Sequence, residues 1–567
     1  MNNFENDRDV LPTWVSTSKV ASLPESHFTR KKNDSVDIPM HTAQIANEFE
    51  KTKETGAAIE LLNTATVEGN KEHALTAANH LKNMEGLPQQ LSMLITSTLQ
   101  PQLAINASAT EYEIASLRAR IRTNRSDPFA WVELSRQYAI IGEKERAKKA
   151  MTVAAQLCKN HRWVSRVAAR AFIHLGEPDR ALSIINRNQL TKIDPWLVAT
   201  EMATARKAEK QTKLWKTAKN MLNSKFSPIN ISELASSVAT NEIISGSNKK
   251  AKAFFKQSLI KPNQTSLAQA KWAERSHNLK NLVDFSIGLD TGAYEANYWE
   301  AYNKKDMVFA LAQAQAWFME EPFSSGPPIA ISYIASLLDD YELIRRATER
   351  GLKANPSNVT LRLNKVFSWI ALTDFSIQNE KTAKQIEDNI RELRQILNGN
   401  DQMSAAHAMA NFGMLLYRTG YPEEGKARYE AAADYFHANG RAAEAILTVN
   451  HLREALICGA PWANEILQRT EFLFKDKKSP ATPGAEFYIN KITKLQKLQG
   501  TWGEKFHNQE LTKPANEEAC QEERKALEKA ISSAELESKF WLPPEFGKVE
   551  SLRGFTLNRI EQKNKNK

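Results

Sequence analysis

The chain has 567 residues and a net charge of +10, with 42% hydrophobic and 25% charged residues. This composition is ordinary for a folded protein and excludes collagen-like structure and wholesale disorder. Gly and Pro number only 21 each, too few for the frequent turns of an all-β fold, so we expect a chain that is nearly all helix.

Residues 1–39 predict a flexible N-terminal arm, because they are polar, contain several prolines and show no helical period. Leu11, Trp14 and Val15 form its one apolar cluster, which could dock on the rest of the chain or on a partner. The first residues are acidic rather than apolar, so we expect no secretory signal. No apolar run approaches the roughly 18 residues that cross a bilayer. We therefore expect a cytoplasmic protein with no membrane partner.

Residues 40–126 show helical periodicity interrupted by Pro88 and Pro101. Helices are expected near 41–52, 55–68, 71–85, 87–99 and 107–124. We interpret them as N-terminal helical hairpins that would cap the first apolar face of a repeat array.

Two stretches 34 residues apart carry the clearest pattern in the chain. The first series is Leu134, Tyr138, Gly142, Ala147 and Met151, and the second is Ala168, Phe172, Gly176, Ala181 and Ile185. In each, a glycine suits the turn between two antiparallel helices, and an alanine lets the helices approach closely where they cross. The interval and these residues, with Trp131 as the large aromatic, resemble the tetratricopeptide repeat (TPR) family.

The resemblance implies an all-α fold: an α-solenoid of antiparallel helix pairs, in a TPR-like superhelix with degenerate terminal caps. Weaker units follow. One contains Gly246 and Ala251, and two others end at Pro322 and Pro356, which are 34 residues apart. A strong last unit spans 405–438. We expect one continuous repeat solenoid rather than several globular domains. The predicted boundaries are 127–475 for the solenoid, 476–484 for a linker, 485–550 for a C-terminal helical cap and 551–567 for a basic tail.

Basic residues are concentrated in the best repeats. Residues 127–226 hold 19 Lys or Arg and 9 Asp or Glu, an excess equal to the net charge of the whole chain, +10. Lysines recur every third residue at 207, 210, 213, 216 and 219. Steps of three rotate around a helix and predict a broad basic surface, which would favour an acidic or phosphate-bearing partner.

The resemblance also implies where a partner would bind, since the first helix of each TPR unit lines a concave groove and its ninth residue points inward. Those residues are Arg136 and Arg170, with Arg166 and His174 one turn to either side of Arg170. Guanidinium groups match carboxylates and phosphates, so this set, with Lys207 and Lys210, could clamp an acidic segment. Ordinary solvated groove charges are the alternative. Arg170 and His174 are also spaced as a ribonuclease acid and phosphate binder would be.

No enzyme signature is found in the sequence. The phosphate-loop, zincin, hydrolase and dinucleotide motifs are all missing. Cys158, Cys458 and Cys520 lie far apart, which signals neither a zinc site nor a disulfide framework. The adjacent pair Asp339 and Asp340 follows a predicted helix and is expected to be solvated. We expect no cofactor and no metal.

We therefore predict a non-enzymatic scaffold or adaptor that binds a protein partner, one with an acidic segment, through the groove of a TPR-like solenoid. The alternative is a nucleic-acid-associated adaptor or nuclease partner that uses the basic surface at 127–226. Neither the oligomeric state nor the identity of the partner follows from the residues.

Overall fold

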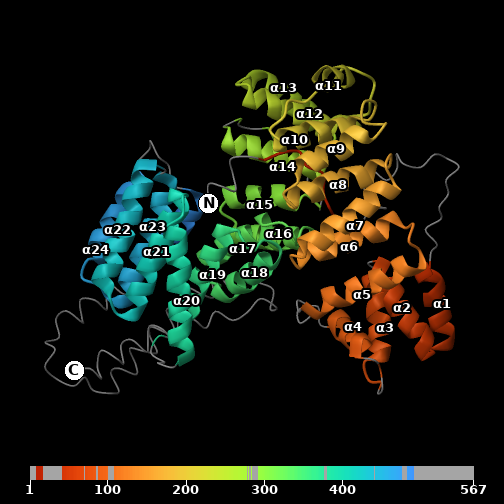
Figure 1. Ribbon diagram of the computed structural model, residues 1–567. Helices are drawn as coiled ribbons and strands as arrows, with labels where there is room; N and C mark the ends of the chain where they lie inside the picture. The colour runs from red at the N-terminus through yellow and green to blue at the C-terminus, as the bar shows by residue number, and fades with distance from the viewer. Residues whose placement is uncertain are drawn as a thin grey trace. The chain divides into compact units, whose positions relative to one another are not determined.

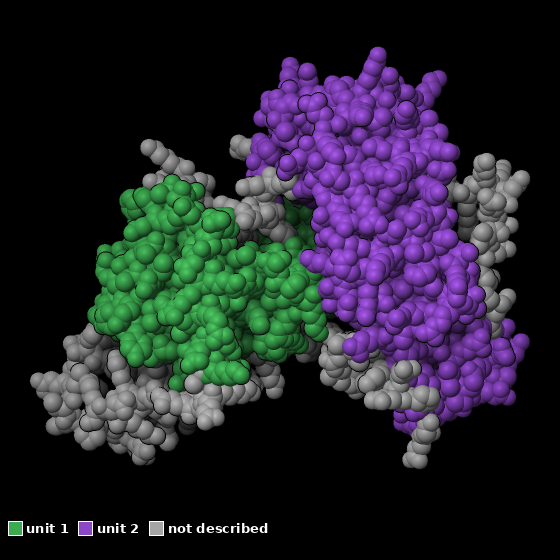
Figure 2. All heavy atoms as spheres, in the orientation of Figure 1, with its two compact units in different colours: residues 1–4, 294–319, 324–567 green, residues 5–293, 320–323 purple. Residues whose placement is uncertain are grey.

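The structure, a computed structural model, describes residues 8–16, 41–68, 70–84, 87, 89–99, 107–277, 279, 282–283, 292–373, 375, 380–439, 441–475 and 482–490. The chain divides into two compact units, coloured separately in Figure 2. The N-terminal unit comprises residues 5–293 with 320–323, and the C-terminal unit comprises 1–4, 294–319 and 324–567. The sequence had predicted one continuous array across 127–475. Residues 491–550 of the predicted C-terminal helical cap and the basic tail at 551–567 lie outside the described residues.

The described residues of the N-terminal unit form fourteen helices, drawn from red to green in Figure 1. They are α1 (His41–Thr52), α2 (Thr55–Glu68), α3 (Lys71–Leu81), α4 (Gln89–Leu99), α5 (Ala107–Thr123), α6 (Pro128–Ile140), α7 (Lys144–Leu157), α8 (Arg162–His174), α9 (Pro178–Arg187), α10 (Pro195–Lys207), α11 (Trp215–Leu222), α12 (Pro228–Ile244), α13 (Asn248–Ser258) and α14 (Gln264–Ser276).

Ten further helices lie in the described part of the C-terminal unit up to residue 475. They are α15 (Tyr294–Asn303), α16 (Met307–Glu320), α17 (Gly326–Leu337), α18 (Tyr341–Ala354), α19 (Val359–Leu372), α20 (Glu380–Leu397), α21 (Gln402–Thr419), α22 (Pro422–Asn439), α23 (Arg441–Cys458) and α24 (Ala463–Lys475). Residues 483–490 are also helical, where the sequence predicted a linker ending at 484. No described residue lies in a β-strand, so the prediction of an all-α chain is confirmed for these ranges.

Several helices begin at a side-chain cap that can be read from the sequence. Asp127 accepts hydrogen bonds from the backbone N–H groups of Phe129 and Ala130, at 3.0 and 3.1 Å, and Pro128 follows it as the first helical residue. Asp194 and Pro195 begin α10 in the same way. A carboxylate satisfies N–H groups that have no partner within the helix, and proline has no N–H to satisfy there.

One turn joins the helices of many pairs and recurs eight times among the described residues. Its central residue has a positive φ, the next N–H donates to the carbonyl five residues earlier, and the central N–H donates three residues back, which together form a Schellman motif. The central residues are Gly142, Gly176, Glu209, Gly246, Lys305, Asp339, Gly420 and Gly459. Glycine adopts this left-handed conformation without the steric cost that a β-carbon brings.

Helices adjacent in the chain pack as pairs, and the first helices of successive pairs also contact one another. In the N-terminal unit α6 contacts α8, α8 contacts α10, α10 contacts α12, and α12 contacts α14. The predicted crossing residues Ala147 and Ala181 have no exposed surface, nor do Met151 and Ile185 beside them. We call the surface formed by α6, α8, α10, α12 and α14 the first-helix face.

The strongest predicted unit of the C-terminal half shows how close its helices come. A β-carbon on Gly413 of α21 would lie 2.9 Å from the ring of Tyr429, and one on Gly425 of α22 would lie 2.6 Å from the ring of Tyr417. Each glycine therefore makes room for a tyrosine of the opposite helix. Among the described residues no helix has the length and apolar character required to cross a bilayer.

Candidate functional site

An extended segment of the chain itself lies along the first-helix face. Residues 8–16, which we call the arm, have no regular secondary structure and appear as the short red trace in Figure 1. Their polar contacts reach α6, α10 and α14. The arm therefore crosses several helix pairs of the N-terminal unit.

The N-terminal end of the arm is held by charge. The Asp9 carboxylate forms ion pairs with Arg206 and Lys207, the latter at 3.2 Å, and the Asp9 side chain is only 3% exposed. The Arg8 carbonyl accepts hydrogen bonds from Arg206 at 2.8 Å and from the amide of Gln269 at 2.9 Å. The Arg8 guanidinium donates in return to Gln269 Oε1 at 2.6 Å. Hydrogen bonds to ionised groups are the stronger kind, so this end is the polar anchor of the arm.

The C-terminal end of the arm is held by apolar contact. Trp14 is fully buried, and its ring centroid lies 4.7 Å from that of Phe323. Arg136 Nε donates to the Trp14 carbonyl at 3.2 Å. Val10 and Val15 are 1% and 2% exposed. Burying a tryptophan removes a large apolar area from water, so Trp14 is the main apolar anchor.

Residues 320–323, which belong to the N-terminal unit, lie next to the Trp14 end of the arm. The Phe323 ring meets His174 edge-on at 5.1 Å, and the Arg170 guanidinium lies 5.3 Å from the ring centroid. Arg170 also pairs with Glu321 at 3.4 Å, and Arg136 donates to the Glu320 carbonyl at 2.9 Å.

His174 has the electrostatics of a packing residue rather than a catalytic acid. Burial lowers its pKa to about 3, and the charges of Arg170 and Lys144 act in the same direction. A general acid or base works best with a pKa near the operating pH. The spacing of Arg170 and His174 therefore gives no support to a ribonuclease interpretation.

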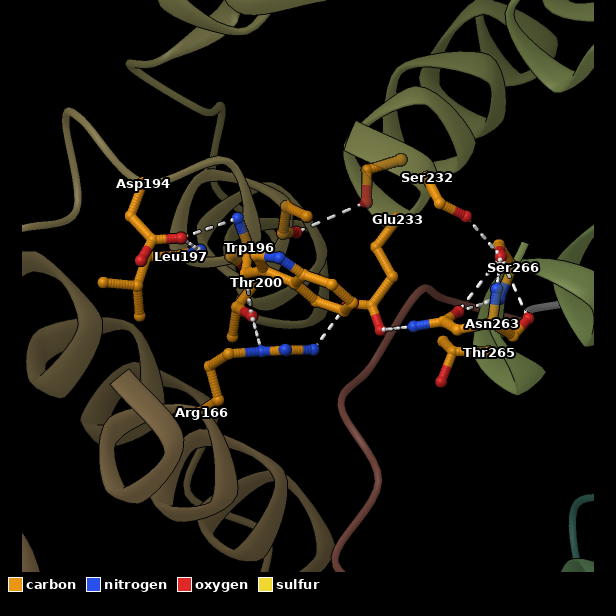
Figure 3. Close-up of polar contacts among 12 residues, drawn as sticks. Arg166, Asp194, Trp196, Leu197, Thr200, Ser232, Glu233, Asn263, Thr265 and Ser266 are labelled. Carbon is orange, nitrogen blue, oxygen red and sulfur yellow. Dashed lines mark hydrogen bonds and ion pairs between the residues drawn. The ribbon is translucent and has the colours of Figure 1, made fainter. Parts of the chain in front are cut away.

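Arg166 lies inside the unit rather than on its surface. It has no exposed surface, and its guanidinium lies 2.5 Å from Glu233 Oε2, 3.2 Å from Thr200 Oγ1 and 4.8 Å from the centroid of the Trp196 ring. Asn263 donates to the other Glu233 oxygen at 2.7 Å. Figure 3 shows these groups pointing toward one another across α8, α10, α12 and the start of α14. This network cross-links successive helix pairs.

Lys207 and Lys210 differ although both are predicted site residues. Lys207 binds the arm through Asp9, whereas Lys210 forms an exposed surface pair with Asp179. Of the predicted set, Arg136, Arg170, His174 and Lys207 contact the arm or residues 320–323. The contacts described for Arg166 are with Thr200, Glu233 and Trp196, and Lys210 pairs with Asp179.

Part of the basic excess of residues 127–226 is matched by acids from elsewhere in the chain. Arg166 pairs with Glu233, Arg170 with Glu321, Lys219 with Glu242, and Arg206 and Lys207 with Asp9. These five basic side chains are therefore already engaged within the protein.

Sequence reasoning did not identify Asp9, Gln269 or Phe323 as members of this site. Asp9 lies five residues before Trp14 in the N-terminal arm. The presence of an acidic residue so close to the apolar cluster was the feature of the sequence that could have pointed to Asp9. Gln269 carries no charge and lies within a helix, so nothing in the sequence distinguishes it from a solvated residue. Phe323 is far from the other members in the chain, and its place depends on tertiary packing.

A second terminal segment is held in the C-terminal unit. The backbone N–H of Gly484 donates to the Tyr302 hydroxyl at 3.3 Å, and Glu486 pairs with Lys305. The buried Tyr488 hydroxyl accepts from Arg453 at 3.0 Å and donates to Asp339 Oδ1 at 3.1 Å. We call residues 482–490 the C-terminal segment. It contacts α15, α23 and the turn before α18.

The expectation that Asp339 and Asp340 are solvated is wrong. They are 5% and 3% exposed. Asp339 accepts hydrogen bonds from the hydroxyls of Tyr341 and Tyr488, and Asp340 caps α18 by accepting from the N–H of Leu343. Burial raises the pKa of Asp340 to about 6. The pair is buried because each carboxylate has hydrogen-bond donors that replace water.

Comparison with known proteins adds no family to this description. No protein-family model matches the chain, and a search of curated proteins finds no similar sequence. Within the described ranges, no group of three or more His, Cys, Asp or Glu side chains is placed to hold a metal ion. The geometry of the N-terminal unit is therefore the basis for a functional proposal.

Proposed function

We propose that this protein is a non-enzymatic adaptor, a solenoid of TPR-like helix pairs that binds an extended segment of a protein partner along the first-helix face of the N-terminal unit. The observation that carries the proposal is the arm. It is an extended piece of polypeptide that already lies on this face and is held by side chains from α6, α10 and α14.

The helix pairs and their turns support the solenoid part of the proposal. The same turn recurs at intervals of 34 residues, between Gly142 and Gly176 and again between Lys305 and Asp339. First helices contact first helices along the N-terminal unit. In a solenoid each unit contacts mainly its neighbours, and the aligned first helices provide one long binding surface.

The contacts to the arm explain how this face would recognise a partner. Arg136, Arg206 and Gln269 bond to backbone carbonyls of the arm, which every polypeptide carries. Their side chains are already positioned by packing, so little conformational entropy remains to be lost when a segment binds. Such a surface suits an extended protein segment.

Nucleic acid is a weaker candidate for the same face. Binding to phosphates needs basic side chains that can exchange their counterions for the nucleic acid, whereas Arg166, Arg170 and Lys219 are engaged by acidic side chains of this chain. This argument ranks a protein partner first.

The proposal is tested by capture of partners from the native cell, with the full-length chain as bait and mass spectrometry as the readout. Lys207→Glu places a negative charge where the arm carboxylate binds, so it should remove specific partners from the captured set. Lys210→Glu is the matched control, because Lys210 is exposed and pairs with Asp179 away from the arm. Nuclease treatment should leave the captured set unchanged. Equal capture by both variants, or loss on nuclease treatment, would contradict the proposal.

A further inference from the structure

We propose that the arm is an internal occupant of the partner site, and that the partner segment repeats its chemistry: an extended chain with a carboxylate followed five residues later by a large aromatic side chain. This inference rests on the proposed function, and it names the class of partner and the competitor that the partner must displace.

Two side chains of the arm provide its specific anchors. Asp9 is buried between Arg206 and Lys207, and Trp14 is buried against Phe323. The Arg8 side chain also donates to Gln269. The other hydrogen bonds named above run through backbone carbonyls of the arm, which carry no sequence preference. A segment with a carboxylate and an aromatic at this spacing would therefore make the same contacts.

The other positions of the arm differ in how many kinds of side chain the face would accept there. Val10 and Val15 are buried next to the anchors, whereas Leu11, Thr13 and Ser16 are only partly buried. We therefore expect small apolar residues directly after each anchor and wide tolerance at the partly buried positions. Pro12, midway between the anchors, is also buried. The recognition pattern is therefore an acid, an apolar residue, a variable residue, a buried residue, a variable residue, an aromatic and another apolar residue.

The arm is not an optimal occupant. The indole N–H of Trp14 is buried and has no hydrogen-bond acceptor among the described residues. A buried donor without a partner loses its bond to water and gains none in exchange. Phenylalanine would fill most of the same space without that penalty. A partner segment with Phe at this position would thus bind the face better than the arm does.

Covalent attachment offsets this weakness. A segment tethered to its own site acts at a high effective concentration, on the order of millimolar for short flexible connections. A free segment must compete against that concentration. The arm therefore sets a threshold that excludes weak ligands and admits segments with both anchors.

The experiment uses a fluorescein-labelled peptide with the sequence of residues 8–18 and the full-length chain, with fluorescence anisotropy as the readout. The peptide should bind Asp9→Lys/Trp14→Ala protein at least about tenfold more tightly than wild type, because the resident arm no longer competes. Changing the peptide's own aspartate to lysine should weaken binding by about tenfold or more, because it then repels Arg206 and Lys207. A tryptophan-to-phenylalanine peptide should bind at least as tightly as the original.

Asp9→Lys alone is the second protein variant, since it removes the polar anchor without opening a cavity in the core. Circular dichroism must show unchanged helicity for each variant used. If the folded variants bind the peptide no more tightly than wild type, or if the lysine peptide binds equally well, the inference is overturned.

Two further outcomes would also overturn it. A wild-type dimer by light scattering that dissociates with Asp9→Lys would show that the arm fills a second copy. Displacement of the peptide by a single-stranded DNA oligonucleotide at lower concentration than by unlabelled peptide would favour nucleic acid as the occupant. If the peptide binds the arm variants no more tightly than wild type while partner capture still depends on Lys207, the adaptor function stands and only this inference fails.

Discussion

Each unit of this protein holds a short segment against its helix pairs, but the two segments are held by different means. The arm is extended and is bound through backbone carbonyls, the charged side chains of Arg8 and Asp9, and the Trp14 ring. The C-terminal segment is helical and is bound through the buried hydroxyl of Tyr488 and the close approach of Gly484 to Tyr333. Backbone contacts accept many sequences, whereas close packing accepts few. The comparison indicates an exchangeable occupant in the N-terminal unit and a built-in structural element in the C-terminal unit.

The largest expected effect concerns the buried arginines of the two units. Arg166→Met removes the ion-pair partner of the buried Glu233 carboxylate, so the N-terminal unit should lose about 3–5 kcal/mol of stability. Arg453→Met should cost less, because Glu454 keeps two hydrogen bonds from Arg418. It should also free the C-terminal segment, since Arg453 bonds to Tyr488. Urea unfolding gives the first quantity and hydrogen exchange of residues 482–490 the second.

The control for the arginine comparison is Arg166→Met/Glu233→Met. Replacing both charges leaves no uncompensated ion, so the double variant should be more stable than Arg166→Met alone. A double variant that is less stable than the single one would show that Glu233 is not left uncompensated.

The next effect tests close packing at Gly484. A β-carbon there would lie 2.3 Å from the Tyr333 hydroxyl and 3.0 Å from Leu337 Cδ1. Gly484→Ala should therefore cost about 1–3 kcal/mol and accelerate hydrogen exchange in residues 482–490. Gly56→Ala is the matched control, since nothing lies within 4 Å of its added carbon. Exchange as slow as in wild type would mean that the C-terminal segment is not tightly packed.

Acid should destabilise both units, because each contains a histidine that stays neutral. Burial lowers the pKa of His451 to about 3 from 6.5, as it does for His174. Below pH 6.5 each of these histidines binds a proton in the unfolded chain but not in the folded chain. The free energy of unfolding therefore falls as the pH falls, by about 1.4 kcal/mol per pH unit for each histidine.

His451→Phe separates the contribution of His451 to the acid sensitivity from that of His174. Phenylalanine can keep the stacking on Tyr429 while it loses the hydrogen bond to Tyr417. The variant should show a weaker fall in stability between about pH 6 and pH 5, measured by urea unfolding. A pH slope equal to that of wild type would assign the acid sensitivity to other groups.

The smallest effect concerns the turns that use no glycine. Glu209 and Lys305 adopt φ of 54° and 63°, a conformation that costs a residue with a β-carbon about 1 kcal/mol. Glu209→Gly should raise stability by up to that amount. Lys305→Gly should gain less, because Lys305 also pairs with Glu486 of the C-terminal segment. Thermal unfolding of the two variants measures the difference, and an equal gain would mean that this ion pair contributes nothing.

Most helices could be predicted from the sequence, and the misses have physical causes. The expected bounds at 41–52 and 55–68 coincide with α1 and α2, because periodicity and caps are local properties. The turns at Glu209, Lys305 and Asp339 were harder to find, since the glycine that marks the other five turns is replaced there. Asp339 and Asp340 were placed in solvent because their hydrogen-bond donors could not be foreseen.

The sequence by itself determined the helices, their turns and the 34-residue interval, because each depends on residues within a few positions of one another. Only the tertiary structure decided which charges are matched. Asp9, Glu233 and Glu321 approach Lys207, Arg166 and Arg170 across 198, 67 and 151 residues of chain. A charge count over a window cannot register such pairs, since Coulomb attraction depends on distance in space and not on separation along the chain. Tertiary structure also placed the arm, whose anchors were ordinary residues until the helices assembled around them.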